Sequence, residues 1–359
     1  MRIYYFGINN ANGGLENFAK NLIAEVSSLD DTVKFTILAI SDMFSYRDEL
    51  IKLGCEVIRI TDPYKNPVKF YYELKNVLKK APKDSIVQLN VCSFRNELLF
   101  RACKKSKLKT IVVGHYTRVD DGLLPILHKI NTRKYSKKFV CVSNSDDVTN
   151  FMFPYCNKVK FINNGVSQER FKFSEEDRNK IRNEYGLNTF VIGQIGRICD
   201  TKNQLFSIKV VENLNKRGFE CRLVLVGKEY DETPKEYVKC NNIKNVEFLG
   251  PIYNGLEKFY SAFDVCLLPS KNEGMSLSLL ESASNGVDAI FSVAVPRLSI
   301  NCPNLTYLEL DENLWANKII EISNKGEKER VSSLIGTIYD LKECARSYIS
   351  LYYDVYNEL

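Results

Sequence analysis

From Leu267 to Glu281 the chain reads LLPSKNEGMSLSLLE. The first two residues end an apolar run that is typical of a buried strand, and the Pro, Ser, Asn and Gly that follow predict a loop. Apolar residues from Leu277 onward recur with helical spacing, so a helix is expected after the loop. A strand, a loop and a helix in this order are the unit from which α/β folds are built.

Two glutamates stand in this stretch with seven residues between them: Glu273 in the loop and Glu281 in the helix. Fully helical spacing would place them about 12 Å apart. The carboxylates of a retaining glycoside hydrolase lie about 5 Å apart, so this pair does not fit hydrolysis of one glycosidic bond. The pair can instead hold the two ends of an extended polar ligand such as a sugar nucleotide. Its diphosphate would then face the backbone N–H groups around Gly274 to Ser276.

The stretch resembles the Glu-x7-Glu element of the family-four retaining glycosyltransferases, which have the GT-B fold. Four further segments are similar to this family and stand in the family's order: FINNGV at 161–166, GQIGRICDTKN at 193–203, LVLVG at 223–227 and VEFLG at 246–250. The second of these looks like the family's strand, loop and helix with a diphosphate-binding Arg and Lys. On this combination, the chain is identified as a member of the family.

Strand-like and helix-like segments alternate along the whole chain, which favours an α/β fold with parallel sheets. Strands are expected near residues 2–7, 34–40, 56–59, 85–89, 110–113, 138–142, 190–195, 222–226, 245–248, 265–268, 289–292 and 307–308. Helices are expected at 15–27, 67–80, 96–105, 175–185, 204–217, 256–262 and 277–285.

A length of 359 residues fits two domains of ordinary size. The Asn-Asn-Gly near Asn163 predicts a boundary, which gives Rossmann-like domains over residues 1–169 and 170–340. The resemblance implies that their parallel sheets face a central cleft. It further implies that the first domain binds the acceptor, that the second binds the nucleotide sugar, and that a C-terminal helix at about 341–359 packs back on the first domain.

Arg197 and Lys202 follow an expected buried strand and lie in a loop that leads into a helix. A nucleoside diphosphate gains negative charge as a glycosyl bond breaks, and two fixed cations beside a helix N-terminus can stabilise that charge without a metal. Arg197 suits a bidentate grip on the diphosphate, whereas Lys202 acts as a point charge. A surface pair at a strand end is the simpler alternative for two such residues.

The resemblance assigns further donor contacts. Glu281 would accept hydrogen bonds from the ribose hydroxyls, and Glu273 would bind hydroxyls of the transferred sugar. Ile252 would face the nucleobase through backbone atoms. The residues after Glu273 would present backbone donors to the sugar or phosphate, namely Gly274, Met275, Ser276 and Leu277. The alternative for Glu273 is an acidic residue that the dipole favours at a helix N-terminus.

The first domain adds two features to the candidate site residues. Gly13 and Gly14 follow the first strand and open a helix, where glycine permits close approach of the backbone to a phosphate. Their spacing is not Gly-x-Gly-x-x-Gly, which disfavours a nicotinamide dehydrogenase. His115 ends another expected strand, and the resemblance places a histidine there in the sugar pocket. His128, the second histidine, has no such support.

The charge is uneven, since residues 1–169 hold 26 Lys and Arg against 17 Asp and Glu. Its basic core runs from 101 to 138 and consists of Arg101, Lys104, Lys105, Lys107, Lys109, Arg118, Lys129, Arg133, Lys134, Lys137 and Lys138. This charge is either a solvated helical face or a surface for an anionic membrane leaflet or a lipid pyrophosphate. Nucleic acid is disfavoured because no binding motif accompanies the charge.

Other signals bound the function. No apolar run is long enough to span a bilayer, and the N-terminus lacks a signal-peptide pattern, so we expect a cytoplasmic protein, peripheral at the inner face of the membrane. Eleven scattered cysteines without Cys-x-x-Cys predict reduced thiols rather than disulfides or a metal site. No Asp-x-Asp occurs, and neither a metal nor a cofactor is expected.

The first interpretation is therefore a retaining, metal-independent transferase that moves a hexose from a nucleoside-diphosphate sugar, a UDP-sugar in the first instance, to a glycan or lipid-linked acceptor. The family context implies bacterial capsule, exopolysaccharide or lipopolysaccharide synthesis. Two alternatives stay open. One is a non-catalytic subunit of the same fold that binds a nucleotide or glycan and assists a partner. The other is a nucleotide-sugar epimerase, for which His115 is the evident acid–base candidate.

Overall fold

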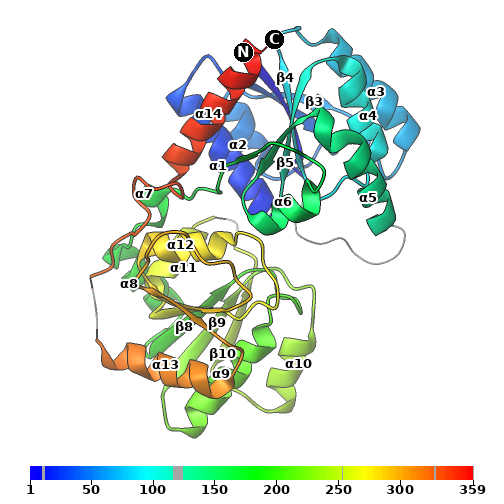
Figure 1. The fold of residues 1–359 in the computed structure, drawn as a ribbon. Helices are drawn as coiled ribbons and strands as arrows, with labels where there is room; N and C mark the ends of the chain where they lie inside the picture. The colour runs from blue at the N-terminus through cyan, green and yellow to red at the C-terminus, as the bar shows by residue number, and fades with distance from the viewer. Residues whose placement is uncertain (10–12, 116–123, 253, 327–328, 359) are drawn as a thin grey trace. The chain divides into compact units, whose positions relative to one another are not determined.

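The computed structural model of the chain describes residues 1–9, 13–115, 124–252, 254–326 and 329–358 (Figure 1). Arg118 of the basic core lies outside these ranges. The chain divides into two compact units: Met1–Gly165 together with Ile338–Leu359, and Val166–Thr337. Within the described residues, no helix combines the length and the apolarity needed to cross a membrane.

Unit 1 contains a seven-stranded parallel sheet in the order β3-β2-β1-β4-β5-β6-β7. Its strands are β1 (Arg2–Phe6), β2 (Lys34–Ala39), β3 (Glu56–Arg59), β4 (Ile86–Val91), β5 (Lys109–Gly114), β6 (Val140–Ser143) and β7 (Val159–Phe161). All six residues of the central β4 are buried, as expected for a strand with both faces covered. The edge strand β7 was not predicted, because its three residues are too short a run to show strand periodicity, and two of them are exposed.

The helices of unit 1 connect these strands. They are α1 (Gly14–Leu29), α2 (Arg47–Lys52), α3 (Pro67–Lys80), α4 (Glu97–Ser106), α5 (Leu124–Tyr135), the short η1 (Ser136–Lys138), α6 (Asp146–Met152) and the C-terminal α14 (Leu341–Asn357). The sequence predicts the bounds of α3 correctly, because Pro67 opens the helix and the side chain of Asn66 caps it by accepting a hydrogen bond from the Lys69 N–H.

Helix α14 returns the end of the chain to unit 1, where it packs along α1 (Figure 1). Its tyrosines Tyr348 and Tyr352 are buried. The Tyr352 hydroxyl donates a hydrogen bond of 2.6 Å to Oε1 of Gln88 on β4. These tyrosines therefore hold the helix to the sheet of its own unit.

Unit 2 contains a six-stranded parallel sheet in the order β10-β9-β8-β11-β12-β13. Its strands are β8 (Phe190–Ile195), β9 (Cys221–Val226), β10 (Val246–Gly250), β11 (Val265–Leu268), β12 (Asp288–Ser292) and β13 (Leu305–Leu308). Its helices are α7 (Gln168–Phe171), α8 (Glu175–Glu184), α9 (Gln204–Lys216), α10 (Thr233–Cys240), α11 (Leu256–Ala262), α12 (Leu277–Asn285) and α13 (Glu312–Asn324). Trp315 on α13 is fully buried and packs edge-to-face on Phe206 of α9.

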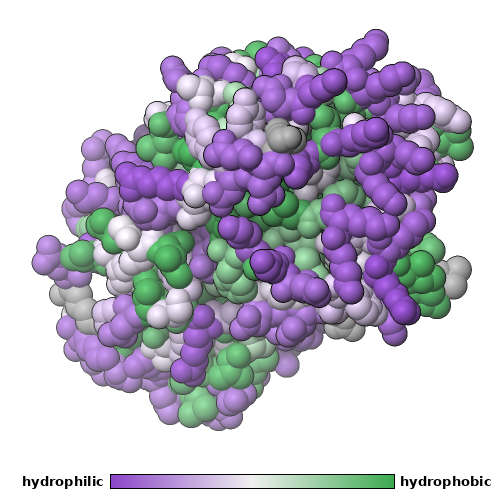
Figure 2. All heavy atoms as spheres, turned by 45° about the horizontal axis from the view of Figure 1, so that its top comes forward, coloured by the Kyte–Doolittle hydropathy of each residue, from purple (hydrophilic) through white to green (hydrophobic). Residues whose placement is uncertain are grey.

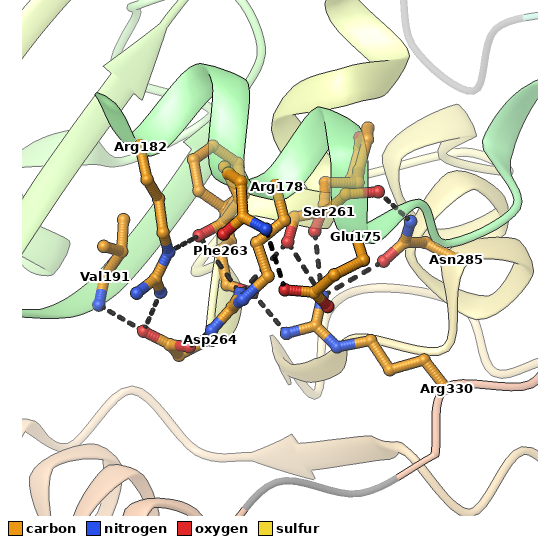
Figure 3. Close-up of polar contacts among 12 residues, drawn as sticks. Glu175, Arg178, Arg182, Val191, Ser261, Phe263, Asp264, Asn285 and Arg330 are labelled. Carbon is orange, nitrogen blue, oxygen red and sulfur yellow. Dashed lines mark hydrogen bonds and ion pairs between the residues drawn. The ribbon is translucent and has the colours of Figure 1, made fainter. Parts of the chain in front are cut away.

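Three arginines close the C-terminal end of α11, whose last carbonyl groups have no partner within the helix (Figure 3). Arg178 and Arg182 come from α8, and Arg330 comes from the segment after α13. Together their guanidinium groups donate to the carbonyl oxygens of residues 260–263. Positive charge at a helix C-terminus also opposes the helix dipole favourably, so this arginine cluster anchors α11.

Candidate functional site

A tight loop follows β8 and carries Arg197. Gly196 has a φ of +150°, and the next residues return to pair with the segment after β9, where the Ile198 N–H donates to the Lys228 carbonyl. The amide of Gln204 then fixes the loop from inside, since it donates to the Arg197 carbonyl at 2.9 Å and accepts from the Cys199 N–H at 3.2 Å. The loop backbone is therefore fastened, while the Arg197 side chain remains exposed.

Gly227, just after β9, is required by this loop. Its φ is +154°, and a Cβ built there would lie 1.9 Å from the Gly196 carbonyl oxygen. We expect Gly227→Ala to lower the free energy of unfolding of unit 2 by roughly 2–3 kcal/mol, because backbone rather than a flexible side chain must move. Denaturant titration measures this loss.

Gly218→Ala is the matched control. Gly218 also has a positive φ, +77°, but a Cβ there would meet nothing within 4 Å. Only the backbone strain of about 1 kcal/mol is expected. Equal losses in the two variants would contradict the close packing of Gly227 against Gly196.

Lys202 and Glu273 form the centre of the site. The Lys202 Nζ lies 2.6 Å from Oε1 of Glu273, and both side chains are mostly buried, at 15% and 12% exposure. The Ser270 hydroxyl donates to the same carboxylate oxygen at 2.7 Å. The ammonium and the carboxylate are thus held at fixed positions, one in the loop after β8 and one in the loop after β11.

Two hydrogen bonds to backbone carbonyl groups join these two loops. The Asn203 side-chain amide donates to the Pro269 carbonyl at 3.1 Å, and the Lys271 N–H donates to the Thr201 carbonyl at 2.9 Å. Because β8 and β11 are parallel neighbours, both loops leave the same edge of the sheet. Ligands of open α/β sheets bind outside this carboxyl edge.

The N-terminus of α12 opens at the same edge. Ser276 is the N-cap residue, but its side chain makes no capping hydrogen bond. The residue is only 5% exposed, and its buried hydroxyl oxygen has no hydrogen-bond partner among the residues that the structure describes. The Ser278 hydroxyl donates to the Ile195 carbonyl at the end of β8 and so holds the helix start against the strand. A helix N-terminus with an unused buried hydroxyl suits an anionic oxygen-rich ligand.

Glu281 lies one turn further along α12 and is 5% exposed. The hydroxyl of Tyr260 on α11 donates to its Oε2 at 2.6 Å. Burial raises the pKa of Glu281 above the ordinary 4.5, although the Tyr260 hydrogen bond acts in the opposite direction. The sequence did not indicate Tyr260 as the partner of this carboxylate.

The raised pKa predicts a stability change in Glu281→Gln. Between pH 4.5 and the folded-state pKa, the folded protein binds the Glu281 proton more tightly than the unfolded chain, so stability falls as pH rises. Glutamine carries no charge to bury. We expect the variant to be more stable than the native protein at pH 7, and the difference to shrink below about pH 4.5, in denaturant titrations of unit 2 at several pH values.

Glu212→Gln is the control, because the pKa of Glu212 is shifted in the opposite direction. Glu212 also accepts a hydrogen bond from a tyrosine, Tyr237, at 2.9 Å, but Lys216 and that tyrosine lower its pKa. Its replacement is expected to destabilise the protein at pH 7. A Glu281→Gln variant that is less stable than the native protein at pH 7 would show that the carboxylate is not buried as described.

Comparison with known proteins gives this site a family. The family described as glycosyl transferases group 1 matches residues 189–324, which contain the Lys202–Glu273 pair and α12. Residues 189–324 are a glycosyl transferases group 1 domain. The sequence matches to glycosyltransferase relatives extend beyond this domain into unit 1.

The glycosyltransferase EpsF of Bacillus subtilis is 24% identical over 96% of this chain and 93% of its own length. The capsular polysaccharide biosynthesis glycosyltransferase CapH of Staphylococcus aureus is 26% identical over 85% and 86%. Among solved structures, Anabaena Alr3699/HepE in complex with UDP-glucose has a TM-score of 0.77 at 16% identity, and the match covers 99% of this chain and all of that one. The chain therefore has the predicted GT-B fold and is a glycosyltransferase.

Within the group 1 domain, the structure brings most of the predicted donor residues to one edge. Arg197 and Lys202 follow β8, and the segment from Glu273 to Leu277 follows β11, its direct neighbour. Ile252 follows β10, which is separated from β8 by β9. Sequence reasoning missed Ser270 and Gln204, which hold Glu273 and the Arg197 loop. Ser270 stands just after β11 and could have been found by the carboxyl-edge rule, whereas Gln204 is the first residue of α9.

Unit 1 holds the remaining predicted residues, Gly13, Gly14 and His115. Gly13 is the N-cap of α1, and its N–H donates to the Glu16 carboxylate at 3.1 Å. His115 is partly buried after β5, and its Nε2 lies 3.0 Å from Oδ1 of Asn90 at the end of β4. Burial lowers the pKa of His115 to about 4, so the ring is neutral at pH 7 and its Nε2–H donates to Asn90.

A cavity of about 740 Å³ lies at the other edge of the unit 2 sheet, beside the arginine cluster. It is lined by Phe190, Asp264 and Asp288, at the amino ends of β8, β11 and β12. The guanidinium groups there already donate to carbonyl oxygens and to Asp264. The cavity is thus separate from the predicted donor residues. Elsewhere in the described residues, no cluster of three or more His, Cys, Asp or Glu could hold a metal ion.

Proposed function

We propose that this chain is a retaining, metal-independent glycosyltransferase that moves a hexose from a UDP-sugar to a glycan or lipid-linked glycan acceptor. The pathway proposed is the synthesis of a bacterial surface polysaccharide. The observation that carries the donor assignment is the group formed by Lys202, Glu273 and the α12 N-terminus with the buried Ser276 hydroxyl, which has no partner among the described residues. The capsular polysaccharide biosynthesis in the name of CapH supports the pathway, and the UDP-glucose bound by HepE supports the donor.

The diphosphate would lie between the Lys202 ammonium and the N–H groups that begin α12. Backbone N–H groups, the helix dipole and a fixed cation all favour an anion there. Arg197, exposed on the fastened loop, can swing to the same anion and grip it through two N–H donors. Glu273 would accept hydrogen bonds from the sugar hydroxyls, and Glu281 from the ribose.

The chemistry would proceed by substitution on one face of the sugar. The bond from the anomeric carbon to the diphosphate oxygen breaks, and the acceptor oxygen bonds to the same face. The acceptor proton passes to the leaving phosphate oxygen, so no carboxylate nucleophile is needed. Lys202 and Arg197 would stabilise the negative charge that collects on the diphosphate. Stabilisation of developing charge by preorganised groups is usually the largest single contribution to catalysis.

The test is a panel of nucleoside-diphosphate sugars with the purified full chain, a membrane extract as acceptor source, and EDTA in parallel. Release of UDP from one UDP-sugar, unaffected by EDTA, together with a product whose anomeric configuration matches the donor by NMR, is the expected result. An inverted product would contradict retention, and loss of release with EDTA would contradict metal independence. Failure of every sugar nucleotide to bind would overturn the donor site.

A further inference from the structure

Helix α5 in unit 1 buries polar side chains and exposes aliphatic ones, the reverse of the usual arrangement. Its buried positions are polar or carry a hydroxyl: His128, Asn131, Thr132 and Tyr135. The His128 Nδ1 accepts from the Phe94 N–H at 3.0 Å, while its Nε2 lies 3.1 Å from the Phe151 carbonyl. The Asn131 amide donates to the Phe94 carbonyl at 2.9 Å. This inward face is fully engaged in hydrogen bonds, so the orientation of the helix is fixed.

Aliphatic side chains occupy the outward face of α5 instead. Ile126, Leu127 and Ile130 are 55%, 46% and 56% exposed. A surface helix normally turns its apolar stripe towards the core and its polar residues towards water. Three large aliphatic residues at i, i+1 and i+4 form one contiguous patch rather than scattered exposure, and such a patch marks a surface that contacts something other than water.

Exposed positive charge stands on the same helix and on the turn that follows it. Lys129 and Arg133 lie on the same helix, and Lys137 follows on η1; all three are exposed and make no ion pair within the part of the chain that the structure describes. Lys104 on the neighbouring α4 lies close enough to Lys138 to lower the pKa of that lysine. Lys104 and Lys138 therefore repel each other, and an anionic partner would reduce that repulsion.

We propose that the outward face of α5, with exposed Ile126, Leu127 and Ile130 and the nearby cations Lys129, Arg133 and Lys137, binds an anionic lipid bilayer. The aliphatic side chains would enter the boundary between head groups and acyl chains, and the cations would meet the negatively charged head groups. Figure 2 shows a hydrophobic group at the right-hand edge among hydrophilic side chains, on the side where Figure 1 draws α5. A purely electrostatic partner such as nucleic acid would leave the aliphatic patch unused.

The inference is tested by co-sedimentation of the full chain with vesicles of phosphatidylcholine alone and of equal parts phosphatidylcholine and phosphatidylglycerol. The native protein is expected to bind the second kind and not the first, and to be released as salt rises from about 0.1 to 0.5 M. Lys129→Gln with Arg133→Gln should weaken binding roughly thirtyfold at low salt, because each lost cation near the surface removes about a factor of five. Ile126→Ser with Ile130→Ser should weaken it at least about tenfold.

Matched controls come from unit 2. Lys239→Gln with Lys244→Gln removes the same charge from exposed positions, and Leu314→Ser removes an aliphatic residue that is 47% exposed on α13. Both are expected to bind vesicles as the native protein does, and thermal midpoints check that all variants fold. The proposal is overturned if the α5 and control variants bind alike, or if neither vesicle binds. It is also overturned if the serine variant instead abolishes a dimer seen by analytical ultracentrifugation, since a second copy would then be the partner.

Discussion

Replacing Lys202 by alanine is expected to lower kcat/KM for UDP release by roughly 100- to 1000-fold. The change removes the cation that would stabilise the leaving diphosphate. It also leaves the Glu273 carboxylate, now 2.6 Å from the Lys202 Nζ, without its ammonium partner. An unpaired carboxylate beside a diphosphate repels it, so the donor KM should rise as kcat falls. Steady-state kinetics with the donor identified by the panel measures both.

Lys271→Ala is the matched control for this variant. Lys271 stands two residues from Glu273, but its ammonium pairs with Asp200 at the surface, where the side chains are 48% and 79% exposed. Surface pairs contribute little, so activity and stability should stay within about twofold and about 0.5 kcal/mol of the native values. If Lys202→Ala lost no more activity than Lys271→Ala, Lys202 would serve only to neutralise Glu273, and the proposed donor site would be wrong.

Apolar periodicity and the positions of Gly and Pro predicted the helices and strands that carry this site. The bounds of β8, β11, α11 and α12 agree with those expected from the sequence. The two strands are apolar stretches that end at Gly196 and Pro269, and the two helices have apolar residues at helical spacing. The last of them ends at Gly286, whose φ of +77° favours glycine at a helix C-terminus. The loop between α11 and β11 and the loop between β11 and α12 were therefore also placed correctly.

Side-chain contacts between different helices and strands could not be predicted from the sequence. The Tyr260–Glu281 pair depends on how α11 packs against α12, and nothing in the spacing of the two residues indicates it. A buried carboxylate needs a donor, but many hydroxyls in unit 2 could have supplied one. The polarity of α5 is a second case. Its aliphatic residues would be assigned to the core by their type, whereas the hydrogen bonds of His128 and Asn131 to Phe94 turn them outward.

Asp264→Ala is expected to destabilise unit 2 strongly, with a loss of roughly 3–5 kcal/mol in the free energy of unfolding. The Asp264 carboxylate, 17% exposed, pairs with Arg178 at 2.6 Å and with Arg182, and its Oδ2 accepts from the Val191 N–H at 2.7 Å (Figure 3). Its removal takes this carboxylate away from both guanidinium groups and from the backbone donor at the start of β8. Urea titration, followed by the fluorescence of Trp315 in the core of unit 2, reports the loss.

The neighbouring guanidinium makes this loss larger than one ion pair would suggest. Burial, together with the nearby Arg178, lowers the pKa of Arg330 to about 10, while Asp264 opposes that shift. Without Asp264 three arginines would share the end of α11 with no carboxylate between Arg178 and Arg182. Asp200→Ala, which removes an exposed partner of Lys271, is the control and should cost less than about 0.5 kcal/mol. Equal losses in the two variants would mean that the carbonyl groups of α11 alone satisfy the arginines, and that Asp264 is dispensable to the cluster.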